Sequence, residues 1–172
     1  MGPSFVARLL ALVEWVLAAP RRWLAAVLLF ALGLIVAAFV LEHGFGVIPC
    51  KMCWWQRYVH WAIAAIAAVG VVAPRWYKVW ALGIGGAALA GLYVAIWQSG
   101  AQVGWWAFPP SCTGWGQALA GDAGDLLAAM ARTKVVPCDK EQFRLLGLTL
   151  AMWNIPAMVM VVAGILASVS KK

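Results

Sequence analysis

Long uncharged stretches dominate the chain, and short segments with charged residues separate them. Four stretches contain no Asp, Glu, Lys or Arg: residues 23–41, 58–74, 79–121 and 145–170. A helix needs about 20 apolar residues to cross the hydrocarbon core of a bilayer. Because backbone groups in lipid must be hydrogen-bonded within the protein, the spanning segments are expected to be helices. The predicted spans are residues 22–41, 54–73, 79–98 and 147–169.

The segment ahead of the first span is shorter and carries charges. Residues 5–19 are apolar apart from Arg8 and Glu14, and they are too few to cross the membrane. An amphipathic helix that lies in the membrane interface fits this pattern. We therefore expect residues 1–20 to form an interfacial segment.

Positive charges orient the predicted bundle. Four spans place both termini on one side of the membrane and the loops 42–53 and 99–146 on the other. The positive residues that bracket the spans most tightly lie on the side of the termini: Arg21, Arg22, Arg75, Lys78, Lys171 and Lys172. Because such residues favour the cytoplasmic side, we expect both termini in the cytoplasm and both loops outside it.

The predicted fold is all-α, a single integral membrane domain over residues 1–172 that forms an antiparallel four-helix bundle. Within the second loop, residues 116–132 carry an interrupted stripe of apolar positions at helical spacing. We expect a short helix there, lying on the membrane surface.

The composition excludes several classes of protein. Hydrophobic residues make up 65% of the 172 positions and charged residues 11%, against roughly a quarter charged in soluble domains. The mean hydropathy is +0.88. A cytosolic enzyme, a disordered chain and a nucleic-acid-binding module are all disfavoured, and the net charge of +7 becomes mainly a topology signal.

All four cysteines fall in the two loops on the same side of the membrane. Cys50 and Cys53 form a C-x-x-C motif at the end of the first loop, and Cys112 and Cys138 flank 25 residues of the second. Outside the cytoplasm, both pairs can form disulfides.

Four kinds of site compete for these cysteines. A zinc site would need a second tight pair or histidines at ligand spacing, and covalent haem would need His rather than Trp54 after the motif. Structural disulfides suit Cys112 and Cys138, since closing such a loop contributes roughly 3 kcal/mol. They suit Cys50 and Cys53 poorly, because a two-residue spacing is a common redox geometry. Redox-active cysteines are favoured, and no metal is expected.

The residues after the motif strengthen the redox interpretation. If the second span starts near Cys53, that sulfur lies at a helix N-terminus, where the macrodipole is equivalent to about +0.5 charge. Arg57 follows four residues later and shares its helix face. Both features favour a thiolate.

With these motifs the chain resembles the disulfide bond formation protein B (DsbB) family, bacterial membrane quinone reductases. The resemblance covers residues 22–170 and rests on an ordered set of segments. They are Glu42-His43-Gly44, Pro49-Cys50-x-x-Cys53, Arg57, Trp105-Trp106, Pro110-Ser111-Cys112, Cys138-Asp139, Phe143–Leu148 and Ala151–Asn154.

The resemblance implies an enzyme of the bacterial inner membrane, a thiol:quinone oxidoreductase. Cys112–Cys138 would take two electrons from a periplasmic dithiol oxidase of the DsbA type and pass them to Cys50–Cys53. Cys53, steadied by Arg57, would hand them to ubiquinone or menaquinone. The protein would supply position and electrostatics for the quinone.

Two positions depart from the family pattern. Many members carry an acid directly before the Arg, where this chain has Gln56, and a His near the end of the third span, where it has Gln98. We expect Gln98 to contact the quinone through a hydrogen bond. His43, in the first loop, could shuttle protons.

Two other functions remain as alternatives. An enzyme of the vitamin K epoxide reductase type is also a four-helix quinone-linked protein, but its loop pair precedes the C-x-x-C, whereas here it follows. A non-catalytic membrane protein with structural disulfides would show no quinone reduction.

Overall fold

The computed structural model describes residues 4–108, 112, 137–138 and 143–170. Its elements, in chain order, are α1 (Phe5–Leu17), α2 (Pro20–Phe45), α3 (Lys51–Val72), η1 (Pro74–Trp76), α4 (Tyr77–Gln102), β1 (Arg144–Leu145), β2 (Leu148–Thr149) and α7 (Leu150–Ser170). The surface helix predicted for residues 116–132 lies outside the described residues.

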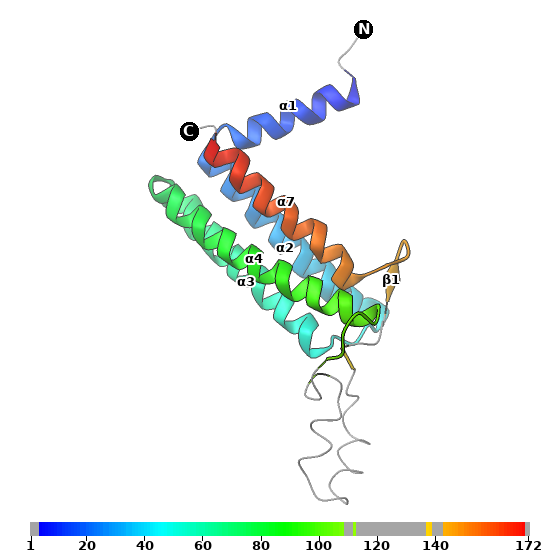
Figure 1. Cartoon of the computed structure of the whole chain (residues 1–172). Helices are drawn as coiled ribbons and strands as arrows, with labels where there is room; N and C mark the ends of the chain where they lie inside the picture. The colour runs from blue at the N-terminus through cyan, green and yellow to red at the C-terminus, as the bar shows by residue number, and fades with distance from the viewer. Residues whose placement is uncertain (1–3, 109–111, 113–136, 139–142, 171–172) are drawn as a thin grey trace, which may run out of the picture.

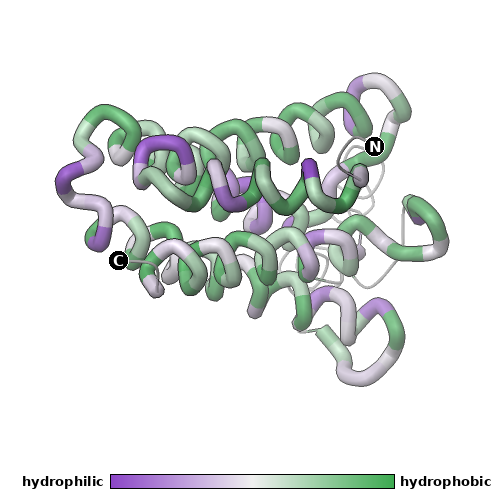
Figure 2. The backbone as a smooth tube through the Cα atoms, turned by 90° about the horizontal axis from the view of Figure 1, so that it is seen from above, coloured by the Kyte–Doolittle hydropathy of each residue, from purple (hydrophilic) through white to green (hydrophobic). Residues whose placement is uncertain are grey.

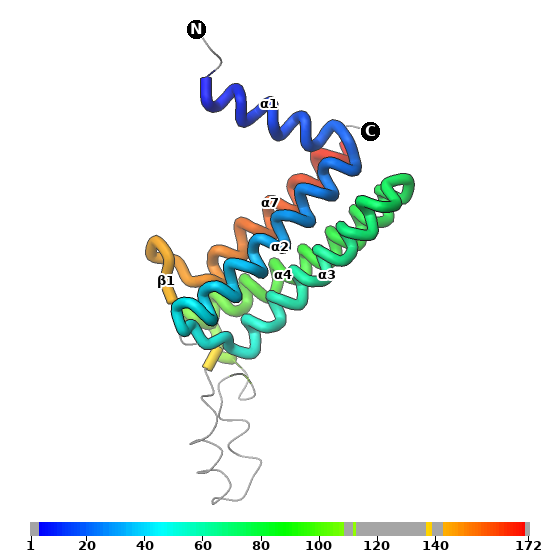
Figure 3. Tube along the Cα trace, turned by 180° about the vertical axis from the view of Figure 1, so that it is seen from behind, coloured from blue at the N-terminus to red at the C-terminus, as the bar shows by residue number. Residues whose placement is uncertain are grey.

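Four long helices run side by side and alternate in direction (Figure 1). Helix α2 packs along α3, α3 along α4, and α4 along α7, whereas α2 and α7 touch over only a short part of their length. Helix α1 and the C-terminal end of α7 lie at one end of the bundle, and the β1–β2 hairpin lies at the other (Figures 1 and 3). The prediction of an all-α membrane bundle is confirmed.

The outer faces of the bundle are apolar, as a protein surrounded by lipid requires. Large apolar side chains such as Leu29, Leu82 and Leu166 are exposed, and hydrophobic positions run along the whole length of the helices (Figure 2). Three segments among the described residues are long and apolar enough to cross a membrane: Pro20–Phe45, Pro74–Gln102 and Leu150–Ser170. Helix α3 falls short of that hydropathy because its first half carries Gln56, Arg57 and His60, yet these side chains are buried within the bundle.

Local signals in the sequence fix the ends of the helices. Pro20 stands in the first turn of α2, where its missing N–H costs nothing. Gly46 ends α2 in the left-handed conformation, with φ +69°, and its N–H bonds to the carbonyl of Leu41. Helix α2 therefore continues to Phe45 and includes Glu42 and His43, which the sequence analysis had placed in the first loop.

A second addition to the predicted fold precedes α7. Arg144 pairs with Thr149, and Leu145 pairs with Leu148, in a two-residue antiparallel hairpin. The Thr149 hydroxyl accepts the N–H of Met152 at 3.3 Å and so caps α7. The same hydroxyl donates to the side-chain oxygen of Gln102, at 2.8 Å, and ties the start of α7 to the end of α4.

Helix α1 stands apart from the bundle core. It has no buried residue, and Phe5, Leu10 and Trp15 are all exposed. The guanidinium of Arg22 lies 4.3 Å from the centre of the Trp15 ring, which joins α1 to the start of α2. This arrangement suits a helix lying in the membrane interface.

Candidate functional site

The C-x-x-C motif forms the first turn of α3. Cys50 is the N-cap residue, and its sulfur accepts the N–H of Cys53 at 3.2 Å. The two sulfurs lie 2.6 Å apart. Because the helix begins at Lys51, the sulfur at the N-terminus of α3 is that of Cys50, and Cys53 is the third helical residue rather than the first.

The second cysteine pair lies against the first. Cys138 is completely buried, in an apolar cluster with Cys50, Met52, Val94 and Phe108, and Cys112 packs at the edge of that cluster. The N–H of Cys138 donates to the carbonyl of Cys112 at 3.1 Å. The fold thus gathers all four cysteines at one end of the bundle, although Cys53 and Cys138 are 85 positions apart in the sequence.

The sulfur of Cys138 is placed to carry a negative charge. A hydrogen bond from the Cys50 thiol is the main cause that lowers the pKa of Cys138, to about 6, and the backbone N–H groups of Met52 and Lys51 lower it further against the opposing effect of burial. The same hydrogen bond raises the pKa of Cys50. These donors therefore favour the thiolate form of Cys138, and two of them belong to the N-terminus of α3.

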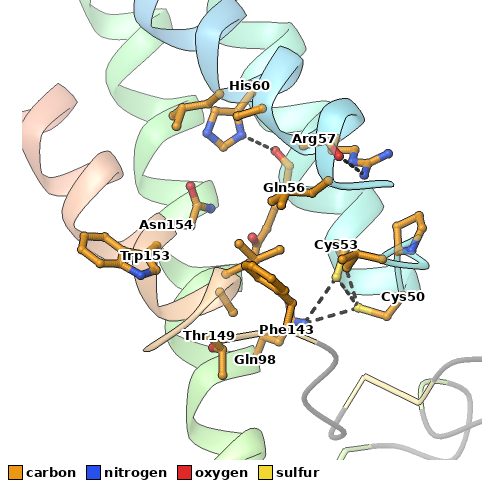
Figure 4. Close-up of a pocket in the computed structure, with 18 of the residues that line it drawn as sticks. Cys50, Cys53, Gln56, Arg57, His60, Gln98, Phe143, Thr149, Trp153 and Asn154 are labelled. Atoms are coloured by element: carbon orange, nitrogen blue, oxygen red, sulfur yellow. Dashed lines mark hydrogen bonds between the residues drawn. The ribbon is translucent and has the colours of Figure 1, made fainter. Parts of the chain in front are cut away.

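Two glutamine side chains connect the sulfurs to the interior of the bundle. The amide nitrogen of Gln56 donates to the amide oxygen of Gln98 at 3.0 Å. This bond turns the nitrogen of Gln98 toward the sulfurs of Cys50, at 3.3 Å, and Cys53, at 3.7 Å (Figure 4). Both glutamines are buried, so Gln98 is a neutral donor held in a fixed orientation beside the cysteines.

Arg57 is buried, and its guanidinium group has several partners within the protein. Its guanidinium forms an ion pair with Glu42 and donates to the carbonyl of Ala38 at 3.3 Å. It also lies over two aromatic rings, 4.9 Å from the centre of Phe39 and 4.8 Å from that of Trp54. The sequence analysis missed Glu42 as a partner because it ended the first span at Leu41.

A cavity of about 200 Å³ lies beside Cys50 and Cys53. Helices α2 and α7 supply much of its lining, and these two helices make few contacts with each other. Most of its wall is apolar: Leu34, Ile35, Ala38, Leu41, Leu150, Ala151 and Ala157 are among the lining residues. Such a cavity, apolar with a few polar groups, suits an apolar ring compound.

The polar residues of the cavity include most of the predicted site. Arg57 and Gln98 both line it, together with Gln56, His60 and Asn154 (Figure 4). His43 does not line it: its exposed ring bonds to the carbonyl of Phe39 at 3.1 Å, near the end of α2. The sequence analysis did not assign His60 or Asn154 to the site, because nothing in the pattern shows that α3 and α7 turn them into one space.

A bundle of membrane helices that holds two cysteine pairs against each other defines a membrane-bound thiol oxidoreductase. The sequence model of the family described as disulfide bond formation protein DsbB matches residues 20–168. The chain belongs to this family and is a multi-pass membrane oxidoreductase of disulfide bond formation.

Curated relatives agree with this assignment over most of their length. The chain is similar to the disulfide bond formation protein B of Aromatoleum aromaticum, 32% identical over 147 residues, which is 81% of this chain and 86% of the relative. It is 28% identical to that of Dechloromonas aromatica over 153 residues, 86% of this chain and 88% of the relative. For Polaromonas the identity is 31% over 151 residues, 80% of this chain and 83% of the relative.

Proposed function

We propose that this protein is a thiol:quinone oxidoreductase of the bacterial inner membrane. It would reoxidise a periplasmic dithiol oxidase of the DsbA type and reduce ubiquinone or menaquinone. The packing of Cys138 with Cys50 in one buried cluster, beside an apolar cavity, is the observation that carries this proposal.

The first exchange takes place at Cys112. Of the loop pair, Cys112 is the more exposed, so a thiolate of the soluble partner attacks its sulfur in a Cys112–Cys138 disulfide. A mixed disulfide forms with Cys112, and Cys138 leaves as the thiolate. Exchange is faster when the leaving thiol has a low pKa, and the N-terminus of α3 provides that for Cys138.

The second exchange carries the electrons toward the membrane. The Cys138 thiolate attacks the Cys50 sulfur of a Cys50–Cys53 disulfide, and Cys53 leaves as the thiolate. The second thiol of the partner displaces Cys112, and Cys112 then attacks Cys138 and releases Cys50. The partner has lost two electrons and two protons, and the Cys50–Cys53 pair has gained them.

The cavity is the proposed quinone site. A quinone there would accept the two electrons and two protons released when the Cys50–Cys53 disulfide forms again. Gln98 would donate hydrogen bonds to the sulfurs and to a quinone ring beside them. Arg57, with Glu42 as its counter-ion, would stabilise the bound ring. His43, exposed near the end of α2, would exchange protons with the periplasm.

The proposed orientation places both termini in the cytoplasm and the four cysteines on the periplasmic side. The tightly bracketing positive residues named above support it. A membrane-impermeant thiol reagent should label the reduced protein in spheroplasts, and it should label inverted vesicles only after they are opened with detergent. Labelling of closed inverted vesicles would reverse the orientation.

Quinone reduction by the purified protein tests the proposed function. With a reduced DsbA-type protein as electron donor, the wild type should reduce decylubiquinone or a menaquinone analogue, and Cys50→Ala and Cys53→Ala should not. Gly86→Ala is the matched control, because a methyl group there meets nothing within 4 Å. Wild-type turnover by either cysteine variant would refute the mechanism, and a wild type without turnover would favour a non-catalytic role.

A further inference from the structure

Within the part of the chain that the structure describes, two buried polar atoms on cavity-lining residues have no hydrogen-bond partner. They are Nε2 of His60 and Nδ2 of Asn154. Each residue is 7% exposed, so neither atom is satisfied by bulk water. Buried polar groups in folded proteins are almost always paired, so two unpaired ones on residues that line one cavity point to a ligand.

Other polar side chains around the cavity already have partners within the protein. Gln56 donates to Gln98, which in turn donates to the two sulfurs. Arg57 is held by Glu42. The indole N–H of Trp153 donates to the carbonyl of Leu145 at 2.9 Å. Of the described cavity residues, His60 and Asn154 are therefore the two with unpaired buried atoms to offer.

The hydrogen-bonding character of each atom follows from its chemistry. Nδ1 of His60 lies 2.7 Å from the carbonyl oxygen of Gln56, and a carbonyl can only accept, so Nδ1 carries the hydrogen. In the neutral ring Nε2 is then an acceptor. Nδ2 of Asn154 is a donor. One donor and one acceptor thus converge on the same cavity from α3 and α7 (Figure 4).

This pair lies deeper in the membrane than the cysteines. His60 follows Cys53 by seven residues, which is two helical turns, or about 10 Å along the same face of α3. A quinone ring carries its two oxygens at opposite ends. If one end of the ring lies at Cys53, the oxygen at the other end points toward the inner part of the cavity, where His60 and Asn154 are found.

We propose that His60 and Asn154 form the inner polar end of the quinone site and bind the ring oxygen that faces away from Cys53. Asn154 donates Nδ2–H to this oxygen in the oxidised quinone, where it is a carbonyl. After two electrons from the Cys50–Cys53 dithiol and two protons have been taken up, the oxygen is a hydroxyl, and its hydrogen is accepted by Nε2 of His60. Asn154 thus binds both redox forms, and His60 selects the reduced one. This inference rests on the proposed function.

Binding of the two redox forms by purified protein tests the pair. Decylubiquinone and decylubiquinol are equilibrated separately with Asn154→Leu and His60→Phe in detergent, and the bound fraction is measured after gel filtration. A lost hydrogen bond of about 1 kcal/mol corresponds to roughly fivefold weaker binding. We expect that loss for both forms in Asn154→Leu and for the quinol alone in His60→Phe.

A matched control separates this role from a general packing effect. Ser99 also has a buried oxygen without a partner, but it does not line the cavity, so Ser99→Ala should bind both forms like the wild type. All variants should still oxidise one equivalent of reduced partner in the absence of quinone, since that step uses only the cysteines. This readout shows that they are folded.

The outcomes are distinct. If the wild type binds both forms and the two variants bind them equally well, the inner site is refuted while the proposed function stands. Equal weakening of quinone and quinol in His60→Phe would refute the selective role of His60. If the wild type binds neither form, the proposed function fails and the inner site fails with it.

Discussion

Replacing Lys51 by proline removes one hydrogen bond from the Cys138 sulfur and leaves the helix intact. Lys51 is the first residue of α3, where proline fits because its fixed φ is already helical. The residue before a proline must be extended, and Cys50 is, with φ −77° and ψ 172°. The substitution therefore removes the N–H of Lys51, one of the donors that lower the pKa of Cys138.

The size of the effect follows from the donors that remain. A hydrogen bond to a charged group contributes about 1.5–3 kcal/mol, and one pKa unit corresponds to about 1.4 kcal/mol. The N–H of Met52 still donates, so we take the lower end of this range. The pKa of Cys138 should rise by roughly one unit.

The sign of the rate change depends on pH. A thiolate with a lowered pKa persists as the pH falls and is lost near that pKa, so the variant should lose its thiolate about one unit earlier. A more basic thiolate is also about threefold more nucleophilic per pKa unit. Attack of Cys138 on Cys50 should therefore be slower than in the wild type at a pH below the wild-type pKa of Cys138, and faster at a pH well above the pKa of the variant.

The assay is a single turnover without quinone. Protein with both disulfides formed is mixed with excess reduced partner, quenched in acid at intervals, and alkylated, and reduction of the Cys50–Cys53 pair is followed by mass. Lys51→Ala is the control, because it removes the same charged side chain but keeps the N–H, and its pH midpoint should equal that of the wild type. A proline variant of wild-type thermal stability with an unshifted midpoint would refute the role of the α3 N-terminus.

Two further predictions concern the bundle and its buried cation. Arg57→Met should raise the KM for quinone about tenfold, a loss of about 1.4 kcal/mol, and Arg57→Lys should raise it less; unchanged kinetics in both would reduce Arg57 to a structural partner of Glu42. Gly91→Ala should lower the thermal unfolding temperature in detergent, because a methyl group there would lie 2.8 Å from Val59 and 2.9 Å from Met158, a clash that costs about 1–3 kcal/mol. Gly86→Ala should not lower it, and equal melting of the two variants would contradict the packing of α4 against its neighbours.

The sequence predicted the helices well because lipid imposes a simple requirement on them. An uncharged stretch of sufficient length has to be a helix, and all four long helices lie where such stretches were found. The predicted helix ends were less accurate where a charged residue was taken as the boundary of a span. Helix α3 starts at Lys51 and α2 runs on to Gly46, since a helix end tolerates a charged side chain. Gly46, directly after Phe45, was the signal in the sequence that could have placed the end of α2.

The site was predicted where one segment holds it and missed where two helices share it. Cys50, Cys53 and Arg57 belong to one motif, so their proximity follows from helix geometry. The ion pair of Arg57 with Glu42 joins α3 to α2, and the shared cavity of His60 and Asn154 joins α3 to α7. Those contacts depend on the rotation of each helix about its axis, which an almost uniformly apolar sequence does not specify.

The position of the cavity between α2 and α7 has a consequence for the order in which the two reactants bind. The wall of the cavity is largely made by α2 and α7, whereas Cys112 and Cys138 lie at the end of the bundle, with Cys138 packed against Cys50. A soluble partner would therefore approach along the bundle axis and a lipid-borne ring across it, so neither would obstruct the other. A ternary complex is sterically allowed, and the reduced pair need not wait for the soluble partner to dissociate before it is oxidised again.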